Sequence, residues 1–127
     1  IILFSAAIPF QGGTNHINEQ WPSYWVKRFA QRGYLLVDCI RGRIWAEPDV
    51  CFWYAQNILL FVDQKTLQGN KSLLEEHQRN LGNQLDVVHP RMYMAMYKRY
   101  LSEQAQSNTP LLVRIKSRLK RFCQINK

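Results

Sequence analysis

Three apolar runs that lack polar alternation constrain the fold most. They span Ile1 to Ile8, Tyr34 to Ile40 and Asn57 to Val62. A strand exposed on one face alternates polar and apolar residues, so an unbroken run predicts a strand covered by helices on both faces. The residues between Pro22 and Gly33 have helical spacing, with proline in the first turn and glycine just past the end. Strand, helix and strand in this order predict a parallel crossover unit.

The rest of the chain predicts an antiparallel return followed by helices. No helix fits convincingly in Arg41 to Tyr54, which we expect to be a loop, so the third strand should run back antiparallel. After Asp63 the pattern becomes helical. We therefore expect two parts, an α/β part at residues 1–63 and a helical extension at residues 64–127.

Three helices are expected in that extension. A capping-box pattern opens one at Ser72, and Gly82 could end it. His89-Pro90 opens a longer one that runs to about Gln106. The last, Leu111 to Phe122, has an apolar stripe beside a cationic face.

The charge distribution separates the two ends of the chain. Residues 1–90 carry eight Lys/Arg and eight Asp/Glu, whereas residues 91–127 carry nine Lys/Arg and one Asp/Glu. The whole net charge of +8 therefore belongs to the tail. Residues 110–122 could contact an anionic membrane surface, bind nucleic acid phosphates, or dock their apolar face on a protein surface. Docking is favoured and nucleic acid is the least favoured partner.

Composition favours a globular protein in a reducing compartment. The chain is 46% hydrophobic, and no apolar run approaches the about 18 residues needed to span a bilayer. Three cysteines without a C-x-x-C pair indicate neither a disulfide framework nor a zinc site, so we expect no metal and a cytoplasmic location. Cys39, inside an apolar run, is interpreted as a small buried hydrophobe.

The stretch from Gly12 to Trp25 holds the densest set of chemical groups. A glycine pair, a histidine, an acid, amides and aromatics lie between an apolar strand and a helix. Loops that leave the carboxyl end of such strands often carry catalytic residues. The alternative is a loop whose polar groups only cap the following helix.

The amino-acid sequence of about the first three quarters of the chain resembles a known family. The segments FSAAIPFQGGTNHINEQWPSYW, GYLLVDCIRGRIW, WYAQNILLFV and DVVHPRMY, within about residues 1–95, are similar to the C-terminal half of class I S-adenosylmethionine-dependent methyltransferases. That Rossmann-like fold has seven strands, the last inserted antiparallel between the fifth and sixth. The three apolar runs would be those strands. The first four strands, with the glycine-rich turn and ribose-binding acid that hold the cofactor, are missing from this sequence.

The resemblance implies that the loops at residues 9–21 and 41–54 meet at the carboxyl edge of the sheet, over the methyl acceptor. A hydroxyl acceptor needs a base, and His16 is the only histidine in these loops. His16 is therefore expected to be the base or a hydrogen-bond partner, oriented by Glu19. The expected acceptor-binding residues are Asn18, Gln20, Arg41, Arg43, Trp45, Trp53 and Tyr54, the last five as an aromatic and cationic wall suited to a sugar or an anion. In the alternative, all of these groups serve loop structure and packing.

Two functions follow as hypotheses. The first is the acceptor-side portion of a methyltransferase that acts on a small molecule or glycan, favouring O-methyl transfer. It needs S-adenosylmethionine and is inactive as an isolated fragment. The second is a non-enzymatic basic α/β module that binds a membrane surface or nucleic acid through its last helix.

Overall fold

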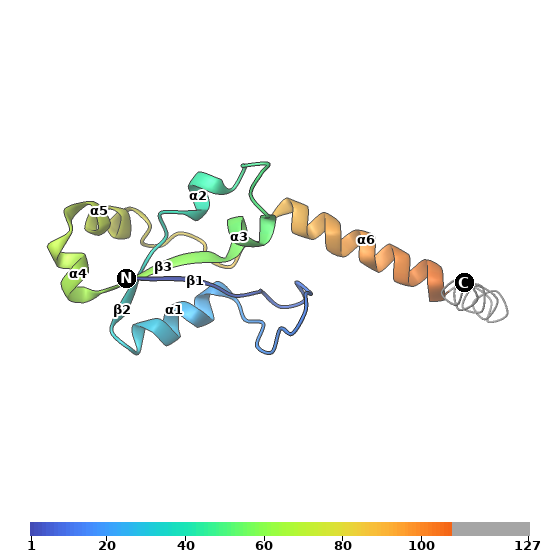
Figure 1. Ribbon diagram of the computed structural model, residues 1–127, viewed down its shortest axis with the longest axis horizontal. Helices are drawn as coiled ribbons and strands as arrows, with labels where there is room; N and C mark the ends of the chain where they lie inside the picture. Colours follow the sequence, from blue (N-terminus) through green and yellow to red (C-terminus); the bar gives the residue numbers. More distant parts are fainter. Residues whose placement is uncertain (108–127) are drawn as a thin grey trace, which may run out of the picture. The chain divides into compact units, whose positions relative to one another are not determined.

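The computed structural model describes residues 1–107, which form a mixed α/β fold with a three-stranded antiparallel sheet and a C-terminal helix (Figure 1). The strands are β1 (Ile2–Ser5), β2 (Tyr34–Val37) and β3 (Ile58–Asp63), in the order β1-β3-β2. β3 runs antiparallel to both neighbours, which confirms the predicted antiparallel return. β1 and β2 both run antiparallel to β3 and therefore run parallel to each other, but they are not hydrogen-bonded because β3 lies between them. Residues 1–107 thus contain no sheet of paired parallel strands.

Helix α1 (Pro22–Ala30) covers one face of the sheet through aromatic contacts. The ring of Phe29 stacks on that of Phe61 at 3.9 Å between centroids, and Phe4 packs edge-on against both. Phe61 is fully buried in the central strand. The predicted helix between Pro22 and Gly33 is confirmed, and Gly33 follows it with a φ of 77°.

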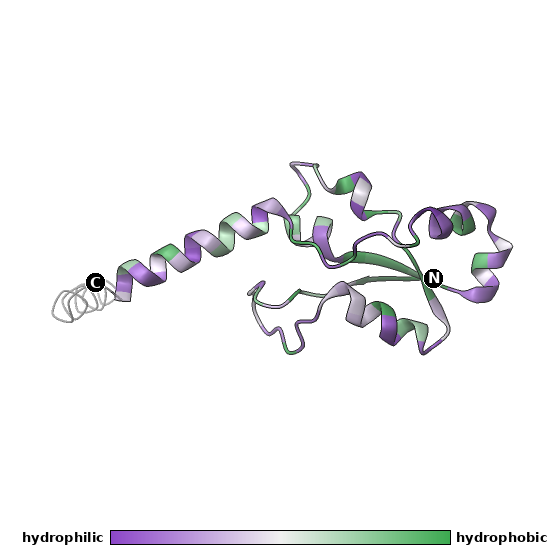
Figure 2. Ribbon diagram, turned by 180° about the vertical axis from the view of Figure 1, so that it is seen from behind, coloured by the Kyte–Doolittle hydropathy of each residue, from purple (hydrophilic) through white to green (hydrophobic). Residues whose placement is uncertain are grey.

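Helices α4 (Gln64–Gly69) and α5 (Lys71–Arg79) contribute to the opposite face. Val37, Val62 and Leu67 form a buried cluster there, with Leu73 and Leu74 packed against it. Because β2 and β3 are covered on both faces, their sequences stay apolar without alternation. Figure 2 shows these hydrophobic strands between more polar helices.

The two edges of the sheet differ. At the β2 edge, the His77 ring Nδ1 donates a hydrogen bond to the Leu36 carbonyl at 2.7 Å. At the other edge, β1 pairs only with β3 among the described residues. Ile1 and Leu3 are 66% and 59% exposed beside that edge. An apolar strand with an unpaired side is a surface for a further strand.

Two short helices replace the loop expected between the second and third strands. They are α2 (Arg41–Ile44) and α3 (Phe52–Asn57). The expectation of a loop throughout residues 41–54 is therefore wrong. Neither helix reaches two full turns, so neither shows a periodic apolar pattern in the sequence.

Side chains fix the starts of the later helices. Asp63 caps α4, and the Asn70 side chain accepts a hydrogen bond from the Leu73 N–H at 3.1 Å to cap α5. The predicted cap at Ser72 is thus wrong by two residues. Helix α6 (Pro90–Ser107) confirms the helix predicted from His89-Pro90 to about Gln106.

The contacts divide the chain after Tyr93, into residues 1–93 and 94–127, whereas the sequence placed a boundary after residue 63. Both α4 and α5 belong to the first unit, which contains the sheet. The helix predicted over Leu111 to Phe122 lies outside the described residues. Within residues 1–107, no helix is long and apolar enough to cross a membrane.

Candidate functional site

The loop that leaves β1 is built from left-handed backbone turns. Phe10, Gly12, Gly13 and Asn15 all have positive φ, of 65°, 73°, 136° and 60°. Non-glycine residues rarely adopt such angles, and strained backbone of this kind concentrates at functional sites. The Gln20 N–H donates to the Ala7 carbonyl at 3.1 Å and closes the base of the loop.

His16 and Glu19 form a pair within this loop. His16 Nδ1 lies 3.1 Å from Glu19 Oε1, and the Phe10 N–H donates to Glu19 Oε2 at 2.8 Å. The hydrogen bond from His16, with those from the Phe10 and Gly12 backbone, holds the pKa of Glu19 below its usual value. An ionised carboxylate at Nδ1 favours the tautomer with its proton there. Nε2 is then the acceptor, and no described residue bonds it.

Gly13 makes room for the imidazole. A Cβ on Gly13 would lie 2.5 Å from His16 Cε1 and 2.8 Å from Nε2. The glycine pair therefore allows the His16 ring to lie against the backbone. The space over Gly13 is filled by this ring and is not an open cradle against the backbone.

Asn18 and Gln20 lie in the same loop and contact each other. The Gln20 side-chain amide donates to Asn18 Oδ1 at 3.1 Å. The structure thus brings together the four predicted residues of this loop as two adjacent pairs. The five predicted residues from the other loop have different surroundings.

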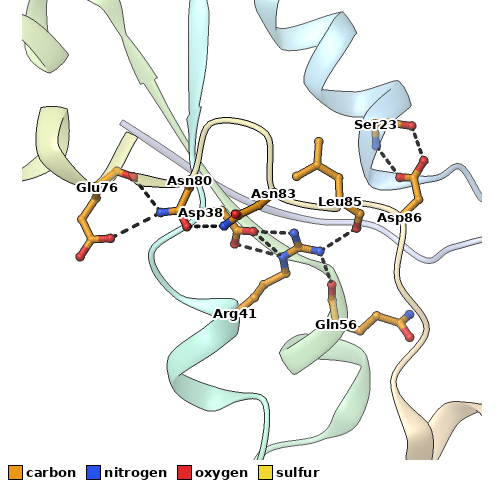
Figure 3. Close-up of polar contacts among 9 residues, drawn as sticks. All are labelled: Ser23, Asp38, Arg41, Gln56, Glu76, Asn80, Asn83, Leu85 and Asp86. Atoms are coloured by element: carbon orange, nitrogen blue, oxygen red, sulfur yellow. Dashed lines mark hydrogen bonds and ion pairs between the residues drawn. The ribbon is translucent and has the colours of Figure 1, made fainter. Parts of the chain in front are cut away.

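Arg41 is a buried residue held by an ion pair. Its side chain is 6% exposed, and its guanidinium contacts both oxygens of Asp38, with Nε at 3.0 Å from each (Figure 3). Nη1 donates to the Leu85 carbonyl at 3.0 Å and to the Gln56 carbonyl at 3.4 Å. Arg41 therefore joins the end of β2, α3 and the segment at residues 80–88. Its guanidinium has little capacity left for an anionic ligand.

The other predicted wall residues are spread along α2 and α3. Arg43 pairs with Glu76 at 2.7 Å on the surface. The Trp45 ring packs on the His89 ring at 4.6 Å between centroids. Trp53 and Tyr54 are 41% and 50% exposed and contact each other. No recorded contact joins these residues to His16 or Glu19 within the described part of the chain, so a single acceptor wall stays a prediction.

A buried polar network ties the two loops together. Gln11 from the first loop accepts a hydrogen bond from the Asn57 side chain at 2.7 Å. The neighbouring Gln56 accepts from the His89 N–H at 2.7 Å, and His89 Nε2 donates to the Trp45 carbonyl at 2.8 Å. Sequence reasoning missed this network. Its signal is the Gln56-Asn57 amide pair directly before an apolar strand.

Metal ligation, the reactivity of Cys39 and comparisons with known proteins also bear on this site. Among residues 1–107, no group of three or more His, Cys, Asp or Glu side chains could hold a metal ion. The Cys39 thiol is partly buried, and that burial raises its pKa, so the thiol is a poor nucleophile. Comparisons with family models, curated proteins and solved structures gave no match.

Proposed function

We propose that this chain is the acceptor-side portion of an S-adenosylmethionine-dependent methyltransferase that acts on a small molecule or glycan, by O-methyl transfer. The observation that carries the proposal is the strand order. β3, the last strand within residues 1–107, lies antiparallel between β1 and β2. The resemblance in sequence implies this order for the fifth, seventh and sixth strands of that fold.

The free edge of β1 supports the same proposal. In the family's sheet, the fifth strand pairs with the seventh on one side and with a further strand on the other. β1 pairs with one strand among the described residues, and the side chain of Leu3 within β1 is exposed. A preceding strand would bury this apolar edge.

The His16–Glu19 pair gives the acceptor side its chemistry. Glu19 is fixed by the Phe10 backbone and holds His16 through Nδ1, which leaves Nε2 facing no described partner. A carboxylate-oriented imidazole is the arrangement that general bases use. His16 would accept the proton that an acceptor hydroxyl loses, and Glu19 would stabilise the imidazolium.

The cofactor would be held by another part of the protein. The resemblance places the cofactor-binding glycine-rich turn and ribose-binding acid in the first four strands, and the His16 ring fills the space over Gly13. Calorimetry should therefore detect micromolar S-adenosylmethionine binding by the full-length protein and none by residues 1–127 alone. Micromolar binding by the isolated chain would contradict this assignment.

The catalytic proposal is tested in the full-length protein. His16→Ala should lower methyl transfer by roughly a hundredfold or more, since general bases contribute on that scale. Glu19→Gln keeps the shape but loses the charge, so a smaller loss is expected. Cofactor binding should not change in either variant. Near-normal turnover of the His16→Ala protein would remove His16 from the mechanism, and absent turnover of the wild type on every hydroxyl acceptor would sink the proposal.

A further inference from the structure

A cavity that is largely open to solvent lies at the carboxyl end of β2, away from the His16 loop in sequence. Its volume is about 500 Å³. Its lining includes Asp38, Arg41, Trp45, Asn80, Asn83 and Gln84. These residues come from the end of β2, from α2 and from the segment after α5.

The charged groups of this cavity neutralise each other. The Asp38 carboxylate and the Arg41 guanidinium form an ion pair, and both side chains are nearly buried. Arg41 Nη1 also donates hydrogen bonds to the Leu85 and Gln56 carbonyls. An anionic ligand would find only one N–H of the Arg41 Nη2 not used in these bonds, and a cationic ligand would compete with Arg41 for Asp38. The cavity is thus suited to a neutral ligand.

The remaining polar groups are carboxamides. The Asn80 amide donates to the Glu76 carbonyl at 2.7 Å, and the Asn83 amide donates to Asn80 Oδ1 at 2.8 Å (Figure 3). These bonds orient Asn80 and Asn83 and leave the Asn83 carbonyl oxygen without a described partner. Gln84 makes no side-chain hydrogen bond to any described residue. Carboxamides both donate and accept, as hydroxyl groups do.

Trp45 adds an apolar surface to these amides. It is half-buried, and its position is fixed because its ring packs on His89 and its carbonyl accepts from His89 Nε2 at 2.8 Å. An indole with a fixed position beside free carboxamides suits the C–H face and the hydroxyl edge of a saccharide ring.

We propose that this cavity binds a neutral saccharide unit through three of its lining residues, Trp45, Asn83 and Gln84. The statement that this saccharide belongs to the methyl acceptor rests on the proposed function. Binding itself does not depend on methyl transfer.

The test measures binding to the full-length protein with no methyl donor present. Neutral methyl glycosides of glucose, galactose, mannose and N-acetylglucosamine are titrated, with glucose 6-phosphate and adenosine for comparison, by saturation-transfer NMR. At least one neutral glycoside should bind in the roughly millimolar range, more tightly than the comparison ligands. No glycoside signal, or stronger binding of the phosphate or adenosine, would overturn the proposal.

Variants locate the bound sugar. Trp45→Ala should weaken binding by about tenfold or more, but it also removes packing on His89. Gln84→Leu therefore provides a second variant on an exposed residue, with Gln78→Leu on the exposed surface of α5 as its matched control. Equal affinity of the Gln84→Leu and Gln78→Leu proteins would overturn the site. Saccharide binding without methyl transfer would contradict the proposed function and leave the cavity assignment supported. Methyl transfer without saccharide binding would support the proposed function and contradict the cavity assignment.

Discussion

Asp86 caps helix α1 from a distant part of the chain. Its two carboxylate oxygens accept hydrogen bonds from Ser23, one from the backbone N–H at 2.9 Å and one from the hydroxyl at 2.7 Å (Figure 3). The residue before the helix, Trp21, supplies no side-chain cap. The first turn of α1, directly after the His16 loop, thus depends on a segment 63 residues further along.

Asp86→Ala should lower the free energy of unfolding by about 1 kcal/mol, because the Ser23 N–H loses its acceptor and the helix start loses a negative charge. Asp86→Asn keeps one acceptor oxygen and should lose less. Ser23→Ala keeps the N–H bond and should also lose less. Urea unfolding of the protein measures all three. A larger loss for Ser23→Ala than for Asp86→Ala would contradict the cap.

Arg41→Met should lower the free energy of unfolding by about 3 to 5 kcal/mol, because Asp38 would be left as an uncompensated buried charge. Arg43→Met is the matched control two residues away. Its partner Glu76 is 16% exposed but the Arg43 side chain is 72% exposed, so the loss should stay below about 1 kcal/mol. Urea unfolding again gives the measurement. Similar losses of unfolding free energy in both variants would show that the Asp38–Arg41 ion pair is not a buried interaction that stabilises the fold.

Asp63 makes the stability of α4 depend on pH. Its oxygens accept hydrogen bonds from the Thr66 N–H at 2.8 Å and the Thr66 hydroxyl at 2.7 Å, which lower its pKa from the usual 3.8. A carboxyl group with a lowered folded pKa contributes stability that is present above its unfolded value and is lost as the pH falls through the folded value. This loss therefore begins below about pH 3.8.

Asp63→Asn should flatten the fall of the urea midpoint as the pH drops below about 3.8. Thr66→Val keeps the backbone donor and removes the hydroxyl, so it should flatten the same curve only in part. The midpoint is followed at several pH values for the three proteins. An unchanged slope in the Asp63→Asn protein would rule out this source of acid sensitivity.

Local signals predicted the elements whose limits depend on neighbouring residues. Pro22 and Gly33 bracket α1, and His89-Pro90 marks the start of α6. The α5 cap was misplaced because Asn70 and Ser72 both precede a possible helix start, and only Asn70 Oδ1 reaches an N–H three residues on. When two neighbouring residues could both cap a helix, the packing of the fold determines which one does, and the sequence alone does not show that packing.

The candidate site was predictable in part for a similar reason. His16 and Glu19 are three residues apart in one loop, so their contact depends only on the conformation of that loop. The burial of Arg41 depends on Leu85 and Gln56, which lie far away in the sequence. A cationic side chain in a Trp-rich loop indicates a surface site unless those distant carbonyls are known.

Gly13 gives the sharpest test of the His16 loop. Gly13→Ala would place a methyl group 2.5 Å from His16 Cε1 at a φ of 136°, so the imidazole must move away from its place against the backbone. The position of His16 relative to Glu19 then changes. Under the proposed function, methyl transfer should therefore fall by roughly tenfold or more. Gly69→Ala is the control, because a Cβ there meets nothing within 4 Å and α4 tolerates alanine. Turnover and urea unfolding are measured together. A Gly13→Ala protein as active as the Gly69→Ala protein would show that the placement of His16 against Gly13 has no part in the proposed reaction.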